Sequence, residues 1–159
     1  MEAKFAADRM LGRLAKWLRL LGHDTIYVRQ ADLTQISSLV TCEHRIFLTR
    51  DQRMFTSLPQ HVPIWFNNRT GAYLLRPVTL PAQLSELRQV FGISPVPRLI
   101  RCSLCNAELT VLARDQAAGR VPDYVVSHQI IFRECPACKR VYWPGTHPQR
   151  MIAFLAQDE

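Results

Sequence analysis

Acidic residues are scarce in this chain of 159 residues, since 13 Asp and Glu stand against 20 Lys and Arg for a formal charge of +7. A balance of this sign favours a polyanionic partner, most simply nucleic acid. The charge alone fits equally well a soluble protein that is merely basic. The scarcity nevertheless makes the position of each carboxylate informative.

Long apolar runs and glycine-rich loops are also lacking. No run approaches the roughly 20 apolar residues of a membrane span, and the first four residues, Met1 to Lys4, do not begin a signal peptide. The six glycines are scattered singly, which excludes a glycine-rich phosphate loop, and no Ser/His/Asp arrangement is legible. We therefore expect no membrane partner and a cytoplasmic location.

Hydrophobic patterning predicts strands that alternate with helices. The strands are expected at residues 4–7, 25–28 and 45–49, with weaker candidates at 62–66 and 72–75. The helices are expected at residues 10–21, 32–42 and 84–91. Such alternation implies βαβ units and a mainly parallel sheet flanked by helices, with functional residues at the carboxyl ends of the strands.

A proline-marked linker at residues 94–99 separates two kinds of composition. The cysteine pairs appear only after it, and no internal repeat is visible. We predict an α/β domain over residues 1–97 and a β-rich zinc-ribbon domain over residues 98–159.

Four of the five cysteines form two Cys-x-x-Cys pairs: Cys102 with Cys105, and Cys135 with Cys138. Two such turns supply the four thiolates that a tetrahedral structural Zn²⁺ site needs. The 29 residues between the pairs would hold a β-hairpin. Unpaired buried thiols and an iron–sulfur cluster are the alternatives. Cys42 stands apart, and we expect it to be a partly buried apolar residue.

Asp8 and Asp51 each follow a predicted strand, and Asp32 opens a predicted helix. A parallel sheet can bring these carboxylates to one edge, where they could bind Mg²⁺ or Mn²⁺ for phosphodiester hydrolysis. Each also has a structural interpretation. Asp8, Asp32 and Asp51 could cap helices or turns, and Asp24 could be a turn residue.

Several segments together resemble the Mut7-C family, in which a PIN-like ribonuclease domain precedes a zinc ribbon. They are "DRMLGRLAKWLRLLGHDT" from Asp8, "RIFLTRD" ending at Asp51, "RCSLCNAEL" from Arg101, "CPACKRVYWPGTH" from Cys135, and Met151. The resemblance implies a divalent-metal ribonuclease with Asp8 and Asp51 as ligands. It also implies a further acid after the second strand, for which Asp32 is the candidate, and Asp24 matches the family pattern as a fourth.

The mechanism implied by the resemblance is hydrolysis, with a metal-bound water attacking phosphorus in line and Asp32 completing the metal shell or orienting the water. The expected phosphate contacts are Arg9, Arg13, Lys16 and Arg50, although a solvated helix face explains these residues equally well. Tyr142, Trp143 and His147 could contact RNA bases, but aromatic residues beside a ribbon more often pack its core.

The leading hypothesis is therefore a metal-dependent ribonuclease with structural Zn²⁺ and catalytic Mg²⁺ or Mn²⁺, acting on RNA. One alternative is an RNA-binding protein of the same fold with weak or no turnover. Another is a module that binds a protein partner through the zinc ribbon.

Overall fold

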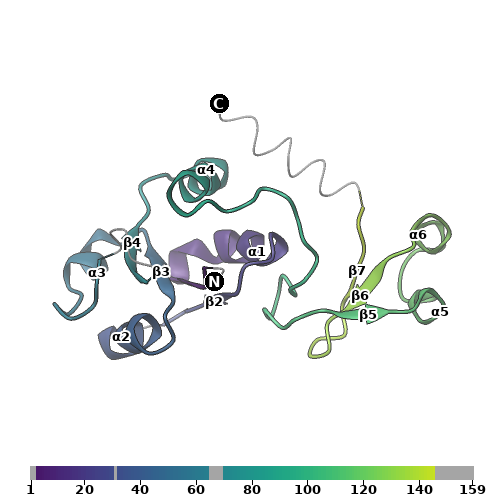
Figure 1. Cartoon of the computed structure of the whole chain (residues 1–159), viewed down its shortest axis with the longest axis horizontal. Helices are drawn as coiled ribbons and strands as arrows, with labels where there is room; N and C mark the ends of the chain where they lie inside the picture. Colours follow the sequence, from purple (N-terminus) through teal and green to yellow (C-terminus); the bar gives the residue numbers. More distant parts are fainter. Residues whose placement is uncertain (1–2, 31, 65–69, 146–159) are drawn as a thin grey trace.

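The computed structural model describes residues 3–30, 32–64 and 70–145 (Figure 1). Its first sheet is parallel throughout, in the order β2-β1-β3-β4. The strands are β1 (Phe5–Ala7), β2 (Thr25–Tyr27), β3 (Ile46–Thr49) and β4 (Gly71–Leu74). The helices around it are the 3₁₀ helix η1 (Arg9–Leu11), α1 (Gly12–Leu20), α2 (Leu33–Thr41), α3 (Gln52–Thr56) and α4 (Leu80–Phe91).

Each face of this sheet is covered by its own hydrophobic cluster. Successive strand residues point to opposite faces, so Phe5 and Leu48 pack with α1 and α4, while Phe47 packs with α2 on the other side. Figure 1 shows α1 and α4 on one side of the strands and α2 on the other. The predicted parallel sheet flanked by helices is confirmed. No helix within the described ranges is long and apolar enough to cross a membrane.

The elements differ from the sequence predictions mainly at their ends. The first helix begins as a tight 3₁₀ turn after Asp8 and becomes α-helical only at Gly12. The last helix of this part begins at Leu80, four residues earlier than expected. Its first turn accommodates Pro81, because an N–H at that position would have no partner within the helix. In the weak candidate 62–66, Ile64 forms only an isolated bridge, and residues 65–66 lie outside the described ranges.

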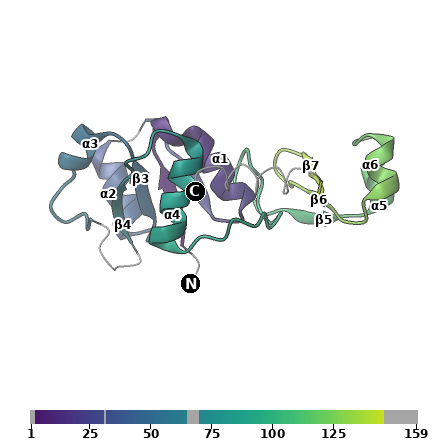
Figure 2. The same cartoon turned by 90° about the horizontal axis from the view of Figure 1, so that it is seen from above.

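A second sheet follows, with antiparallel strands β5 (Thr110–Leu112), β6 (Phe132–Glu134) and β7 (Val141–Tyr142). The predicted hairpin is present as β5 and β6, but its connection also contains two short helices, α5 (Arg114–Ala117) and α6 (Asp123–His128). Apolar residues of these helices pack on Phe132 and give the ribbon a small core of its own. Figures 1 and 2 show this part beside the first sheet, beyond the end of α1.

Gly22, just after α1, lies where the two parts of the chain meet. Its φ of +96° belongs to the left-handed region, and a Cβ atom there would approach Ile100 Cδ1 to 3.0 Å and Arg98 Cβ to 3.1 Å. The backbone N–H of Arg98 also donates to the carbonyl of Leu20 at 3.2 Å. The linker therefore packs directly on the C-terminal end of α1.

We predict that Gly22→Ala lowers the free energy of unfolding more than Gly92→Ala. Both glycines have positive φ, which costs a residue with a Cβ about 1–2 kcal/mol, but a Cβ at Gly92 would meet nothing within 4 Å. Urea denaturation of the two variants checks this. Equal losses would contradict the close packing at Gly22.

Candidate active site and metal centre

Asp8 and Asp51 lie at the carboxyl ends of two adjacent parallel strands. Asp8 directly follows β1 and Asp51 lies two residues beyond β3, whose register pairs Ala7 with Leu48. Thr49, the last residue of β3, connects them. Its hydroxyl donates to Asp8 Oδ2 at 2.5 Å and accepts from the backbone N–H of Asp51 at 2.9 Å. The two acids are thus positioned through one side chain that the sequence analysis did not single out.

Asp8 is the more buried of the pair, with 2% of its surface exposed. Its second oxygen accepts from the backbone N–H of Met10 at 2.9 Å and so caps η1. No Lys or Arg of the described residues forms an ion pair with Asp8. A buried carboxylate without a cationic partner is costly, so this position favours a bound cation. The cap and the metal ligand are compatible interpretations of Asp8.

Asp51 is half-buried and caps α3 through the backbone N–H of Met54, at 3.1 Å. Asp32 is exposed and caps α2 through the backbone N–H of Gln35, at 2.7 Å. In the described ranges, the four paired cysteines are the single group of three or more potential ligand side chains close enough to share one ion. The structure therefore does not bring Asp8, Asp32 and Asp51 together as a compact triad.

Asp24 lies at the opposite end of the sheet, before β2. Arg45 Nη1 donates to its carboxylate at 2.9 Å, and Asn106 Nδ2 donates at 2.8 Å. Burial disfavours the charged carboxylate, but these hydrogen bonds outweigh burial and lower the pKa of Asp24 below its ordinary value. The candidate catalytic acid Asp24 is thus separated from Asp8 and Asp51 and braces the contact with the ribbon.

Arg19 lies on α1 like the exposed Arg13 and Lys16, but its own side chain is buried. It is 8% exposed. Its Nε donates to the carbonyl of Thr25 at 2.7 Å, and its Nη1 donates to the carbonyl of Leu104 at 2.7 Å. The ribbon covers this end of the helix, and the guanidinium fork satisfies backbone carbonyls from both parts.

The four expected phosphate contacts have different surroundings. Arg9, Arg13 and Lys16 are exposed, whereas Arg50 is half-buried beside Asp51. The Nε atom of Arg50 is buried and has no hydrogen-bond partner among the described residues. A buried donor without a partner is unfavourable.

The four paired cysteines converge as predicted. Their Sγ atoms all lie within 4.8 Å of one another, with Cys102 to Cys138 at 3.5 Å and Cys105 to Cys135 at 3.4 Å. Tetrahedral Zn²⁺ with bonds of about 2.3 Å places its sulfurs roughly 3.8 Å apart, so the cluster can hold zinc. Cys42 is exposed rather than partly buried, because it follows the last turn of α2 on the solvent side.

The two cysteine turns have the same backbone design. Asn106 and Lys139, directly after the second cysteine of each turn, have φ of +70° and +60°. Their N–H groups donate to the carbonyls of Cys102 and Cys135 at 3.0 and 2.9 Å. This repetition closes each turn around its two sulfurs.

Tyr142 supports the cluster from β7. Its hydroxyl lies 3.1 Å from the sulfur of Cys102 and accepts from the backbone N–H of Ser103 at 3.2 Å. Burial raises the pKa of the Cys102 thiol, but hydrogen bonds from Tyr142 and nearby backbone outweigh burial and lower it to about 6. Trp143 packs on the ribbon core, so packing explains both aromatic residues, while His147 lies outside the described ranges.

Together these features define an α/β protein whose parallel sheet has acids at one edge and a zinc-ribbon-like part beside the other. The chain belongs to the Mut7-C RNAse domain family, which matches residues 3–155. This membership suggests a nuclease-type enzyme with RNA as substrate or partner. Comparisons with curated proteins and with solved structures give no significant match.

We predict that Asp24→Asn lowers the free energy of unfolding by about 1.5–3 kcal/mol near neutral pH, the range for a hydrogen bond to a charged group. Because folding lowers the pKa of Asp24, its contribution is full above the ordinary value of about 3.9 and disappears as pH falls through the folded-state pKa. Urea denaturation from pH 7 to pH 3 measures the difference. Asp115→Asn, at an exposed acid of the ribbon, is the control. A difference that does not shrink in acid would contradict the proposed pairing.

We also predict that chelation unfolds the ribbon before the first sheet, because metal binding at four thiolates supplies folding free energy. Hydrogen exchange should accelerate in β5 and β6 before it does in β1 and β3. Cys135→Ser should lose bound zinc and show the same pattern, whereas Cys42→Ser should retain one zinc per chain. Simultaneous loss of protection in both sheets would oppose a separate ribbon.

Proposed function

We propose that this chain is a metal-dependent ribonuclease that hydrolyses RNA phosphodiester bonds at the edge carrying Asp8 and Asp51. The observation that carries the proposal is the buried carboxylate of Asp8, which has no basic partner in the described ranges and is joined to Asp51 through Thr49. Membership of the Mut7-C RNAse domain family supports the same chemistry.

The residues present fit a Mg²⁺ or Mn²⁺ ion. Such an ion commonly binds one or two carboxylates, several waters and the substrate phosphate, and Asp8 and Asp51 supply the carboxylates. When bound, it would activate a water and neutralise charge on the phosphodiester. Thr49 would orient Asp8, and the guanidinium of the half-buried Arg50, next to Asp51 in the chain, would bind the phosphate.

The other candidate residues have supporting parts in this proposal. Arg9, Arg13 and Lys16, all exposed, would contact the RNA backbone. Asp32 would orient water from the rim of the site, since it caps α2 at an exposed position. Asp24 would act structurally. Zn²⁺ at the four cysteines would also be structural, because all four positions of a tetrahedral site are taken.

The proposed division is a PIN-like nuclease domain at residues 1–97 and a zinc-ribbon domain at residues 98–159. The arrangement of the hydrophobic clusters supports it, because the two clusters of the first sheet contain no residue beyond Ile93 and the two ribbon clusters contain none before Cys102.

We predict that Asp8→Asn and Asp51→Asn each reduce Mn²⁺- or Mg²⁺-dependent cleavage of a labelled RNA at least about 100-fold, since changes beyond the metal ligands already cost 10–100-fold. Asparagine is a matched substitute, because it caps helices as well as aspartate does. Asp115→Asn, far along the chain in α5, should cleave normally. Unchanged cleavage in both site variants would exclude this edge as the active site.

One observation favours the alternative of an RNA-binding protein with little turnover. Asp8, Asp32 and Asp51 do not form a compact group, and Asp32 is engaged as a helix cap. Binding of RNA by the unaltered protein, with no cleavage at any Mn²⁺ or Mg²⁺ concentration, would favour this alternative. Asp32→Asn measures how much the third acid contributes to cleavage.

The protein-interaction alternative is supported by apolar side chains on the ribbon surface. Val111 and Ile130 are 80% and 88% exposed. Failure to bind RNA at low salt, where phosphate contacts are strongest, would exclude both nucleic-acid functions and leave this alternative.

A further inference from the structure

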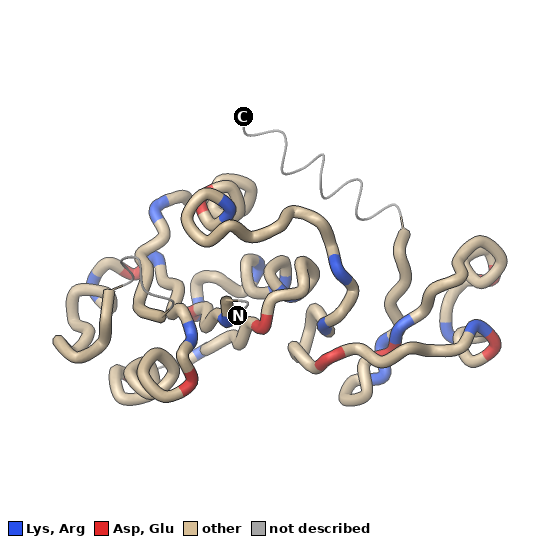
Figure 3. The backbone as a smooth tube through the Cα atoms, viewed as in Figure 1, with Lys and Arg blue, Asp and Glu red and all other residues tan. Residues whose placement is uncertain are grey.

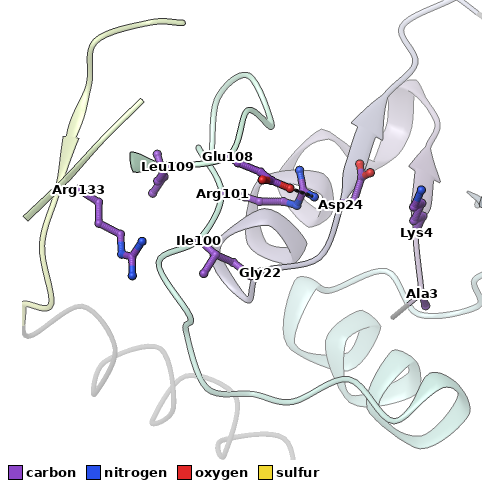
Figure 4. Close-up of a pocket in the computed structure, with 9 residues that line it drawn as sticks. All are labelled: Ala3, Lys4, Gly22, Asp24, Ile100, Arg101, Glu108, Leu109 and Arg133. Atoms are coloured by element: carbon purple, nitrogen blue, oxygen red, sulfur yellow. Dashed lines mark hydrogen bonds and ion pairs between the residues drawn. The ribbon is translucent and has the colours of Figure 1, made fainter. Parts of the chain in front are cut away.

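A cavity of about 490 Å³ lies between the first sheet and the ribbon, at the end of the sheet opposite to Asp8 and Asp51. Lys4, Gly22 and Asp24 line it from one side, and Arg101, Glu108 and Arg133 line it from the other (Figure 4). Residues from both parts of the chain build this cavity, and the site proposed above makes no use of it.

The charges around this cavity do not balance. Arg45 pairs with Asp24 at 2.9 Å, and Arg101 pairs with Glu108 at 3.1 Å. Both acids of the lining are therefore neutralised. Lys4 and Arg133 remain, and neither forms an ion pair with a residue in the described ranges. Arg133 is also half-buried on β6, and a partly desolvated guanidinium favours an anionic ligand.

Helix α1 connects this cavity to the edge that carries the acids. The chain leaves the carboxyl end of β1 at Asp8, runs back along the sheet through α1 and reaches the cavity at Gly22. Arg9, Arg13 and Lys16 are exposed along this path, spaced four and three residues apart as on one side of a helix. Figure 3 shows basic positions on α1 and again where the linker enters the ribbon.

We propose that the cavity binds backbone phosphates of an RNA segment that flanks the cleaved bond, so that the substrate extends from the acidic edge past α1 to the ribbon. This inference rests on the proposed function and adds a second contact site on the same substrate. Lys4 and Arg133 bind phosphate oxygens there, and Arg101 contributes when its pair with Glu108 opens. Such contacts position the strand without reading its sequence.

The test is the salt dependence of RNA binding, measured without added Mg²⁺ or Mn²⁺ so that the strand stays intact. Each phosphate contact on a single strand contributes about 0.7 to the slope of log K against log salt. The double variant Lys4→Ser/Arg133→Ser should therefore make this negative slope shallower by about 1.4, which is twice 0.7. Arg76→Ser/Arg88→Ser removes the same charge from two exposed positions beyond β4 and is the matched control.

Two further variants test whether misfolding, rather than loss of the phosphate contacts, changes the slope. Lys4→Arg/Arg133→Lys keeps both charges and should keep the slope. Lys4→Ser alone changes an exposed residue and should make the slope shallower by about 0.7. Zinc content and circular dichroism establish that each variant is folded.

The outcomes separate this inference from the proposed function. If the unaltered protein cleaves RNA and the double variant keeps the slope of the control, the cavity does not bind phosphate and the inference is overturned, while the proposed function stands. If the unaltered protein and the double variant cleave a short RNA equally, but only the unaltered protein cleaves a longer strand more efficiently, the inference is supported. If the unaltered protein neither binds nor cleaves RNA, both fail together.

Discussion

The buried guanidinium of Arg19 is the interaction on which the arrangement of this protein depends. It bonds backbone carbonyls of Thr25 in the sheet and of Leu104 in the first cysteine turn. Burial lowers its pKa, while the nearby Cys102, Cys105 and Asp24 oppose that shift. A lysine ammonium is a point charge and would not fix the orientation of the ribbon on the sheet in this way, whereas the planar guanidinium bonds two fixed carbonyls at once. Together with the bonds of Asn106 to Thr25 and Asp24, this contact joins the first sheet to the ribbon.

The polarity of the parallel sheet separates chemistry from assembly. All strands end at the same edge, so Asp8 and Asp51 meet there, linked by Thr49. All strands begin at the other edge, where Asp24, Arg45 and Asn106 join the sheet to the ribbon. The proposed metal site is therefore kept apart from the structural ion pairs, and the buried charge of Asp8 is not neutralised by the bases that serve the interface.

The sequence predicted what depends on local pattern. Strand β3, helix α1 and the cysteine cluster follow from β-branched runs, helical spacing and paired cysteines. It could not predict what depends on contact between distant segments. Helical spacing does not distinguish the buried Arg19 from the exposed basic residues of α1, because nothing local reveals that the ribbon covers this end of the helix. Asp24 stands before a strand rather than after one, and this position was a signal that it belongs to the other edge. The segment "LTRD" likewise contains Thr49, which links Asp8 to Asp51.

Asn106 gives the first cysteine turn an influence beyond its own sulfurs. Its left-handed backbone closes the turn, while its side chain accepts from the N–H of Thr25 at 3.0 Å and donates to Asp24. Thr25 begins β2, an outer strand of the first sheet. A nascent chain whose cysteine turn is still open would leave that N–H unsatisfied and the outer strand incompletely anchored. Closing the first cysteine turn therefore also completes the hydrogen bonding at the start of β2, so this turn contributes to the first sheet as well as to its own sulfurs.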